Sequence, residues 1–169
     1  MALIALLAFG FFSKGGADIA EGDAVPEAQL STLDGTGTES LADYRGQWVL
    51  VNFWASWCNP CRTESPDLQS YQEKYGSDTF TVLGINQRDL TEDADEFIEE
   101  FGLTYPQLRD AEGEQADPFG MTGLPESFLV DPKGDIALIR RGPIDMEYLE
   151  RYVTPLITAA TVPPEETSS

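Results

Sequence analysis

The chain has 169 residues, about one folded domain, and 41% of them are hydrophobic, as in ordinary globular proteins. Its 30 acidic residues outnumber 10 basic ones and give a formal net charge of −20, which argues against nucleic acid as a partner. Histidine is absent and 2 cysteines are present, which excludes Ser-His or Cys-His nucleophile pairs, histidine-bound metals and a tetrahedral structural zinc site.

The chain begins with an apolar run from Ala2 to Phe12. This run is shorter than the about 20 residues that span a bilayer, but it suits the core of a signal peptide. The small residues Gly15-Gly16-Ala17 follow it and resemble a cleavage site. We therefore expect residues 1–17 to be a signal peptide or a truncated membrane anchor. The protein is then periplasmic or extracytoplasmic. If residues 1–17 are an anchor, it is attached to the inner membrane.

Alternating strands and helices are expected beyond residue 24. Residues 47–55 form a continuous apolar run rich in β-formers, which predicts a strand buried on both faces. A helix is expected over 59–75 and a second buried strand over 79–86. An amphipathic helix is predicted next, because apolar side chains recur at helical spacing at Ala94, Phe97, Ile98 and Phe101.

The last part of the domain is predicted to be a hairpin and a helix. A loop region around 104–122 precedes two short strands, 127–131 and 135–140, with a turn at Asp131-Pro132-Lys133-Gly134. A final helix is expected over 145–154, and the polar tail 161–169 is expected to be disordered. This order predicts an α/β fold over residues 24–158, with a mixed central sheet, helices on both faces and a C-terminal antiparallel hairpin plus helix.

The two cysteines form a C-x-x-C motif between the first strand and the first helix. Cys58 would lie at the helix N-terminus, where free amide protons favour a thiolate, and Pro60 fits the first turn. Cys61 lies one turn later, within reach of a disulfide. We expect Cys58 to be the exposed attacking thiol and Cys61 to resolve the mixed disulfide. A static structural disulfide is the alternative, but it would close a very short loop and constrain the unfolded chain little.

Longer motifs carry a family resemblance. The segment from Asn52 to Arg62 (NFWASWCNPCR), with Glu64 and Pro66, resembles the extracytoplasmic thioredoxins of the TlpA/ResA and DsbE/CcmG type. So do Tyr105-Pro106 and the segment from Gly120 to Asp131 (GMTGLPESFLVD). The resemblance covers about residues 24–158. It implies a thioredoxin fold and a thiol-disulfide oxidoreductase that reduces disulfides of extracytoplasmic proteins.

The resemblance also implies roles for residues around the cysteines. Pro125 should follow a cis peptide bond and lie against the pair, leaving the backbone before it free to contact a substrate chain. Glu64 matches an active-site glutamate that exchanges a proton with Cys61, although a solvent-facing helix glutamate is an equal alternative. Asn52 replaces the buried aspartate of thioredoxin itself. Substrate contacts are expected from Trp57, Asn59, Pro60 and Leu124, and Trp57 could instead only pack.

The expected redox group is the Cys58–Cys61 pair itself, with no other cofactor and no metal. The partners that the resemblance implies are protein disulfide substrates, including apocytochrome c, and a membrane thiol transporter as electron donor. A disulfide oxidase or isomerase would use the same pair at a higher reduction potential. A peroxidase would need a Thr-x-x-Cys nucleophile, which the segment before Cys58 does not supply. A metallochaperone would need a third soft ligand, for which Met121 is the nearest methionine.

Overall fold

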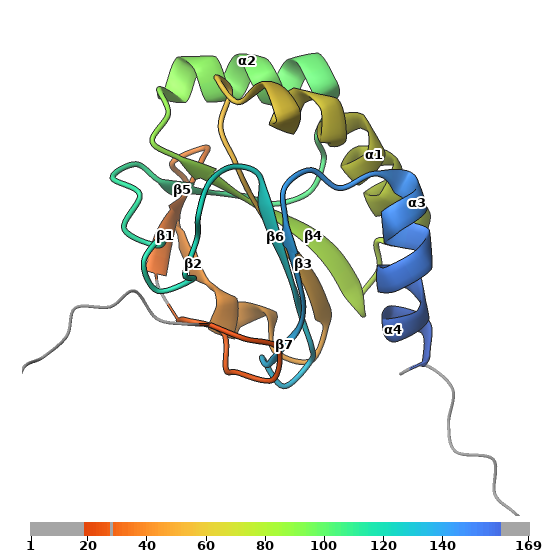
Figure 1. Cartoon of the computed structure of the whole chain (residues 1–169). Coiled ribbons are helices and arrows are strands. Elements are labelled where there is room, and N and C mark those ends of the chain that lie inside the picture. Colours follow the sequence, from red (N-terminus) through yellow and green to blue (C-terminus); the bar gives the residue numbers. More distant parts are fainter. Residues whose placement is uncertain (1–18, 28, 160–169) are drawn as a thin grey trace, which may run out of the picture.

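The computed structural model of the protein describes residues 19–27 and 29–159 (Figure 1). The predicted signal or anchor segment 1–17 and the predicted disordered tail 161–169 lie outside these described residues. Within the described ranges, no helix combines the length and the apolar character needed to cross a bilayer.

The described residues form a mixed sheet of the order β2-β1-β5-β4-β3-β6-β7. Its central strands β3, β4 and β5 are parallel to one another, and the flanking pairs β1–β2, β1–β5, β3–β6 and β6–β7 are antiparallel. The strands are β1 (Gln29–Thr32), β2 (Thr38–Ser40), β3 (Trp48–Trp54), β4 (Phe80–Gln87), β5 (Gln107–Asp110), β6 (Glu126–Val130) and β7 (Ile136–Arg141).

The helices follow the predicted order. They are the 3-10 helix η1 (Leu41–Tyr44), α1 (Asn59–Tyr75), α2 (Thr91–Phe101), and a C-terminal helix built from α3 (Met146–Tyr148), the π-helical turn η2 (Leu149–Val153) and α4 (Thr154–Ala159). The predicted helix over 59–75 is confirmed with the same bounds. The final helix runs past the predicted end at residue 154, because its buried stripe continues through Val153 to Ile157.

The two faces of the sheet are covered unequally. One core joins the sheet to α1, α2 and the C-terminal helix, with Leu68, Phe97 and Leu149 among its buried side chains. These helices form an arc along one side of the sheet (Figure 1). The second core is closed by η1 and by loop residues such as Phe119. Helices were expected on both faces; among the described residues, three long helical segments cover one face and the 3-10 turn η1 is the helix on the other.

Two parts of the sheet were not predicted. The strands β1 and β2 are short and half-exposed, so they lack the long apolar run that marks β3. The predicted loop region 104–122 contains β5, whose side chains alternate between buried and half-buried positions over only 4 residues. Its buried Leu108 pairs with Ile85 of β4 and extends the parallel part of the sheet. These strands are therefore held by neighbouring strands rather than by a strong local pattern.

Candidate active site

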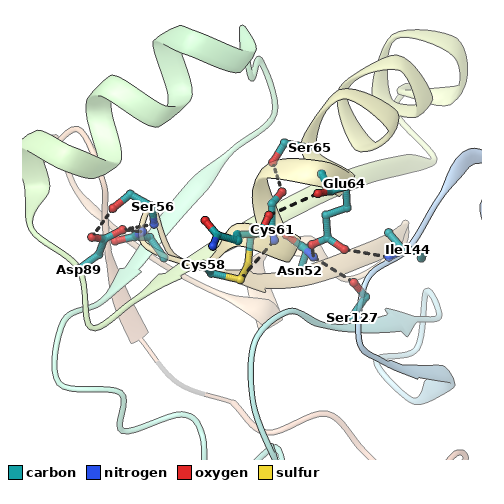
Figure 2. The surroundings of a disulfide bond; sticks show 12 residues. Asn52, Ser56, Cys58, Cys61, Glu64, Ser65, Asp89, Ser127 and Ile144 are labelled. Atoms are coloured by element: carbon teal, nitrogen blue, oxygen red, sulfur yellow. Dashed lines mark hydrogen bonds between the residues drawn. A yellow bond between two sulfur atoms is a disulfide. The ribbon is translucent and has the colours of Figure 1, made fainter.

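The cysteine pair lies where β3 leads into α1. Cys58 is the N-cap of the helix, and its Sγ accepts a hydrogen bond of 3.2 Å from the backbone N–H of Cys61. The two residues form a disulfide with their Cα atoms 5.3 Å apart (Figure 2). Pro60 occupies the first turn, where its missing N–H leaves no helical hydrogen bond unmade. The same N–H that reaches Cys58 in the disulfide would stabilise a thiolate on that sulfur.

The exposure of the pair follows the expected order, but the difference is small. Cys58 is 4% exposed and Cys61 is fully buried. The indole of Trp57 is the large exposed group beside the pair, at 61% exposure, and its Nε1 donates to the backbone carbonyl of Arg88. Asn59 and Pro60 are exposed as well.

Glu64 is buried one turn beyond Cys61, at 2% exposure, so it does not lie on the solvent-facing side of α1. One carboxylate oxygen accepts from Nδ2 of Asn52 at 2.8 Å, and the other accepts from the backbone N–H of Ile144 at 2.9 Å (Figure 2). Burial raises the pKa of Glu64 to about 7, against the opposing effect of these two hydrogen bonds. A carboxyl group with this pKa can give or take a proton near neutral pH.

Asn52 explains how an acid from the helix is held in this position. Its side chain extends from the centre of β3 and is itself buried. The amide Nδ2 donates to Glu64 and also to Oγ of Ser127 on β6, at 3.1 Å. The strand thus supplies a neutral amide, and the carboxyl group comes from α1 instead. Sequence reasoning placed Glu64 in the site and noted Asn52 only as the replacement of a thioredoxin aspartate; it predicted neither the contact between them nor the role of Ser127.

The loop that leads into β6 lies against the disulfide region. The Leu124–Pro125 peptide bond is cis, as the resemblance implied, and Leu124 packs against the core cluster that contains both cysteines. In the described part of the chain, the backbone N–H and C=O of Leu124 have no hydrogen-bond partner. An extended substrate segment could pair with these free groups.

Glu126, which was not predicted as a site residue, holds this loop in place. Its side chain is 1% exposed. One carboxylate oxygen accepts from the backbone N–H groups of Thr122 and Gly123 and from the Thr122 hydroxyl, and the other pairs with Arg141 at 2.6 Å. A buried carboxylate with this many donors fixes the backbone that leads into Pro125.

Asp89 performs a similar task for the segment before the cysteines, and no local pattern in the sequence marks it. It lies in the turn after β4 and is 8% exposed. Its carboxylate accepts from the backbone N–H and hydroxyl of Ser56, at 2.6 and 2.8 Å, and also from Nδ2 of Asn86 and the N–H of Leu90. Figure 2 shows Ser56 and Asp89 to one side of the disulfide and Glu64 with its partners to the other.

Comparison with known proteins identifies the family of the chain. The model of the AhpC/TSA family matches residues 21–139. The chain is 32% identical over 135 residues to the thiol-disulfide oxidoreductase ResA of Oceanobacillus iheyensis, covering 78% of this chain and 70% of that protein.

Solved structures resemble the whole fold. A thiol:disulfide interchange protein of the thioredoxin family from Chlorobium tepidum matches with a TM-score of 0.71 and 30% identity, over 83% of this chain and 99% of that one. A secreted thiol-disulfide isomerase from Corynebacterium glutamicum matches with a TM-score of 0.72 and 30% identity, over 79% and 85% of the two chains. The fold and the cysteine pair agree with these matches, and the chain therefore belongs to the AhpC/TSA family, among its thioredoxin-fold thiol-disulfide oxidoreductases.

Proposed function

We propose that this oxidoreductase works as a reductant of protein disulfides outside the cytoplasm. The Cys58 thiolate attacks a substrate disulfide, forms a mixed disulfide and releases one substrate thiolate. Cys61 then attacks the Cys58 sulfur, which releases the second substrate thiolate and leaves the Cys58–Cys61 disulfide. Two electrons pass from the dithiol to the substrate, and the pair needs no further cofactor.

The observation that carries the reducing direction is the electrostatic setting of the pair. A strongly oxidising C-x-x-C protein needs a very stable thiolate at its first cysteine. Here the helix N-terminus stabilises that thiolate, but no lysine or arginine among the described residues donates a hydrogen bond to either sulfur. On the opposite side, Glu64 with a pKa of about 7 carries part of a negative charge at neutral pH. The dithiol is therefore only moderately favoured, and it gives up its electrons readily.

Glu64 completes this mechanism as a proton carrier. When Cys61 attacks the mixed disulfide it must lose its proton, and a buried carboxylate one turn away can accept it. When the pair is reduced again, the protonated carboxyl group can return that proton. The pKa near neutrality allows both steps at the same pH.

The proposed location outside the cytoplasm rests on the N-terminal segment and on the relatives. An apolar run and small residues over residues 1–17 support export, and one structural relative is described as secreted. In an oxidising compartment a reductant needs a continuous supply of electrons, for which a membrane thiol transporter is the proposed donor. Apocytochrome c is the proposed substrate among the proteins that the family resemblance implies.

The reduction potential tests the proposed direction. Equilibration of the protein with glutathione or dithiothreitol buffers, followed by thiol alkylation, gives the ratio of dithiol to disulfide. We expect a value closer to about −270 mV, as in thioredoxin, than to about −120 mV, as in DsbA. A value above about −180 mV would instead support a disulfide isomerase or oxidase, the alternative that shares this cysteine pair.

A further inference from the structure

A cleft of about 250 Å³ opens beside the cysteine pair. Trp57, which directly precedes Cys58, lines one side of it. The loop that leads to Pro125 lines the cleft through Met121 and Leu124, and Arg88 lines it as well. The volume is below the about 300–1,000 Å³ of typical small-molecule sites. It suits a side chain of a bound peptide better than a cofactor.

Arg88 is held rigidly in this cleft. Its backbone has a positive φ of 50°, a conformation that only a few per cent of non-glycine residues adopt. Its backbone carbonyl accepts from Trp57 at 3.1 Å, and its own Nε donates to the carbonyl of Glu112 at 3.1 Å. The turn is fixed further by Asp89, which binds Ser56. The turn that contains Arg88 and Asp89 thus fixes the positions of both the Trp57 indole and the Arg88 side chain.

The charged end of Arg88 is free. Its two terminal amino groups have no hydrogen-bond partner among the described residues, and the side chain forms no ion pair there. The chain has 30 acidic and 10 basic residues, so carboxylates that could pair with this arginine are plentiful. A guanidinium with two free amino groups binds a carboxylate through paired hydrogen bonds.

We propose that Arg88 is a specificity determinant that selects substrates with an acidic side chain beside the reacting cysteine. The substrate chain pairs with the free backbone of Leu124 and places that acidic side chain on Arg88, between Trp57 and Met121. The global charge of −20 repels acidic proteins, so the selection depends on this local contact rather than on the overall field. The inference rests on the proposed disulfide reduction.

The test compares peptide disulfides that differ only in the residue after the cysteine, which is Asp, Asn or Lys. The rate constant of each peptide with the reduced protein is divided by its rate constant with dithiothreitol, because a neighbouring charge changes the reactivity of any disulfide. We expect the wild-type protein to prefer the Asp peptide over the Lys peptide by about two- to five-fold, the effect of a solvent-exposed ion pair. The preference should shrink as salt is added.

Variants separate Arg88 from the rest of the surface. Arg88→Glu should reverse the preference, and Arg88→Lys should keep its direction. Arg151→Glu is the matched control, since Arg151 lies on the C-terminal helix and outside this cleft, and it should keep the wild-type preference. Equal normalised rates for all three peptides with the wild-type protein would overturn the inference, whatever the variants do. Failure to reduce any peptide would instead overturn the proposed function.

Discussion

Replacing Glu64 by glutamine should change how the stability of the oxidised protein depends on pH. The wild-type carboxyl group is buried, and its pKa is raised from an ordinary 4.5 to about 7. Between these two pH values the native state keeps a proton that the unfolded chain has released. The free energy of unfolding therefore falls as pH rises through this window. At about 1.4 kcal/mol per pH unit, the raised pKa corresponds to a loss of about 3 kcal/mol by pH 8.

The side-chain amide that Glu64→Gln introduces would remove this loss, because it has no charge to bury. The introduced side-chain oxygen can accept from the backbone N–H of Ile144. The introduced NH2 group can donate to Oδ1 of Asn52 once the Asn52 amide rotates by half a turn, which points Nδ2 of Asn52 away from residue 64. The Glu64→Gln variant should thus match the wild-type protein near pH 4.5 and exceed its stability by up to about 3 kcal/mol at pH 8.

Urea unfolding of the disulfide form at several pH values measures this effect, since the cysteines do not titrate in that form. The exposed Glu99→Gln on α2 is the matched control and should run parallel to the wild-type protein. A difference between Glu64→Gln and the wild-type protein that stays constant from about pH 5 to pH 8 would refute the assignment of a buried proton to Glu64.

Three further outcomes are expected. Cys61→Ser should accumulate covalent substrate adducts, because Cys58 can still attack but nothing resolves the mixed disulfide, whereas Cys58→Ser should form few; equal trapping on non-reducing gels would contradict these roles. In the reduced protein, Cys61 should ionise at a higher pH than Cys58. Glu64→Gln should lower the pH at which Cys61 ionises, because it removes a neighbouring negative charge. Thiolate absorbance followed against pH measures this, and identical curves for the variant and the wild-type protein would show that Glu64 and Cys61 do not interact. Asp89→Asn should lower the free energy of unfolding by about 1–3 kcal/mol, because its NH2 group would face groups that also donate, while the exposed Asp93→Asn should not; equal urea midpoints would contradict this.

The sequence was most informative where a local pattern and a tertiary requirement coincide. The apolar run of β3 is buried along nearly its whole length, and the C-x-x-C motif lies at the junction with α1. Both could be predicted because a central parallel strand and a helix start each have strong local signals. Pro125 and Glu64 were singled out through the family motif, and the burial of Glu64 excludes the solvent-facing alternative.

The remaining parts of the site depend on contacts that no local pattern encodes. Asp89 and Glu126 resemble ordinary polar residues next to a turn and a strand. Each becomes important because the fold brings a distant or neighbouring loop with unpaired donors against its carboxylate. The strand β5 was likewise missed, since its short alternation is weaker than the loop signals around it. Residues that hold other residues in place are thus the ones that sequence reasoning finds last.

The hydrogen bond from the backbone N–H of Ile144 to Glu64 links the segment that leads into the C-terminal helix to the proposed proton exchange. That N–H belongs to the residues just before Met146, whose own N–H binds Asp67 further along α1. A chain cut before Ile144 would open Glu64 to water and return it to the behaviour of a surface acid, which is fully ionised at neutral pH. The proposed proton exchange between Glu64 and Cys61 would then no longer operate near neutral pH. The segment around Ile144 therefore shields the Glu64 carboxyl group from water, and the C-terminal helix that follows it covers the sheet.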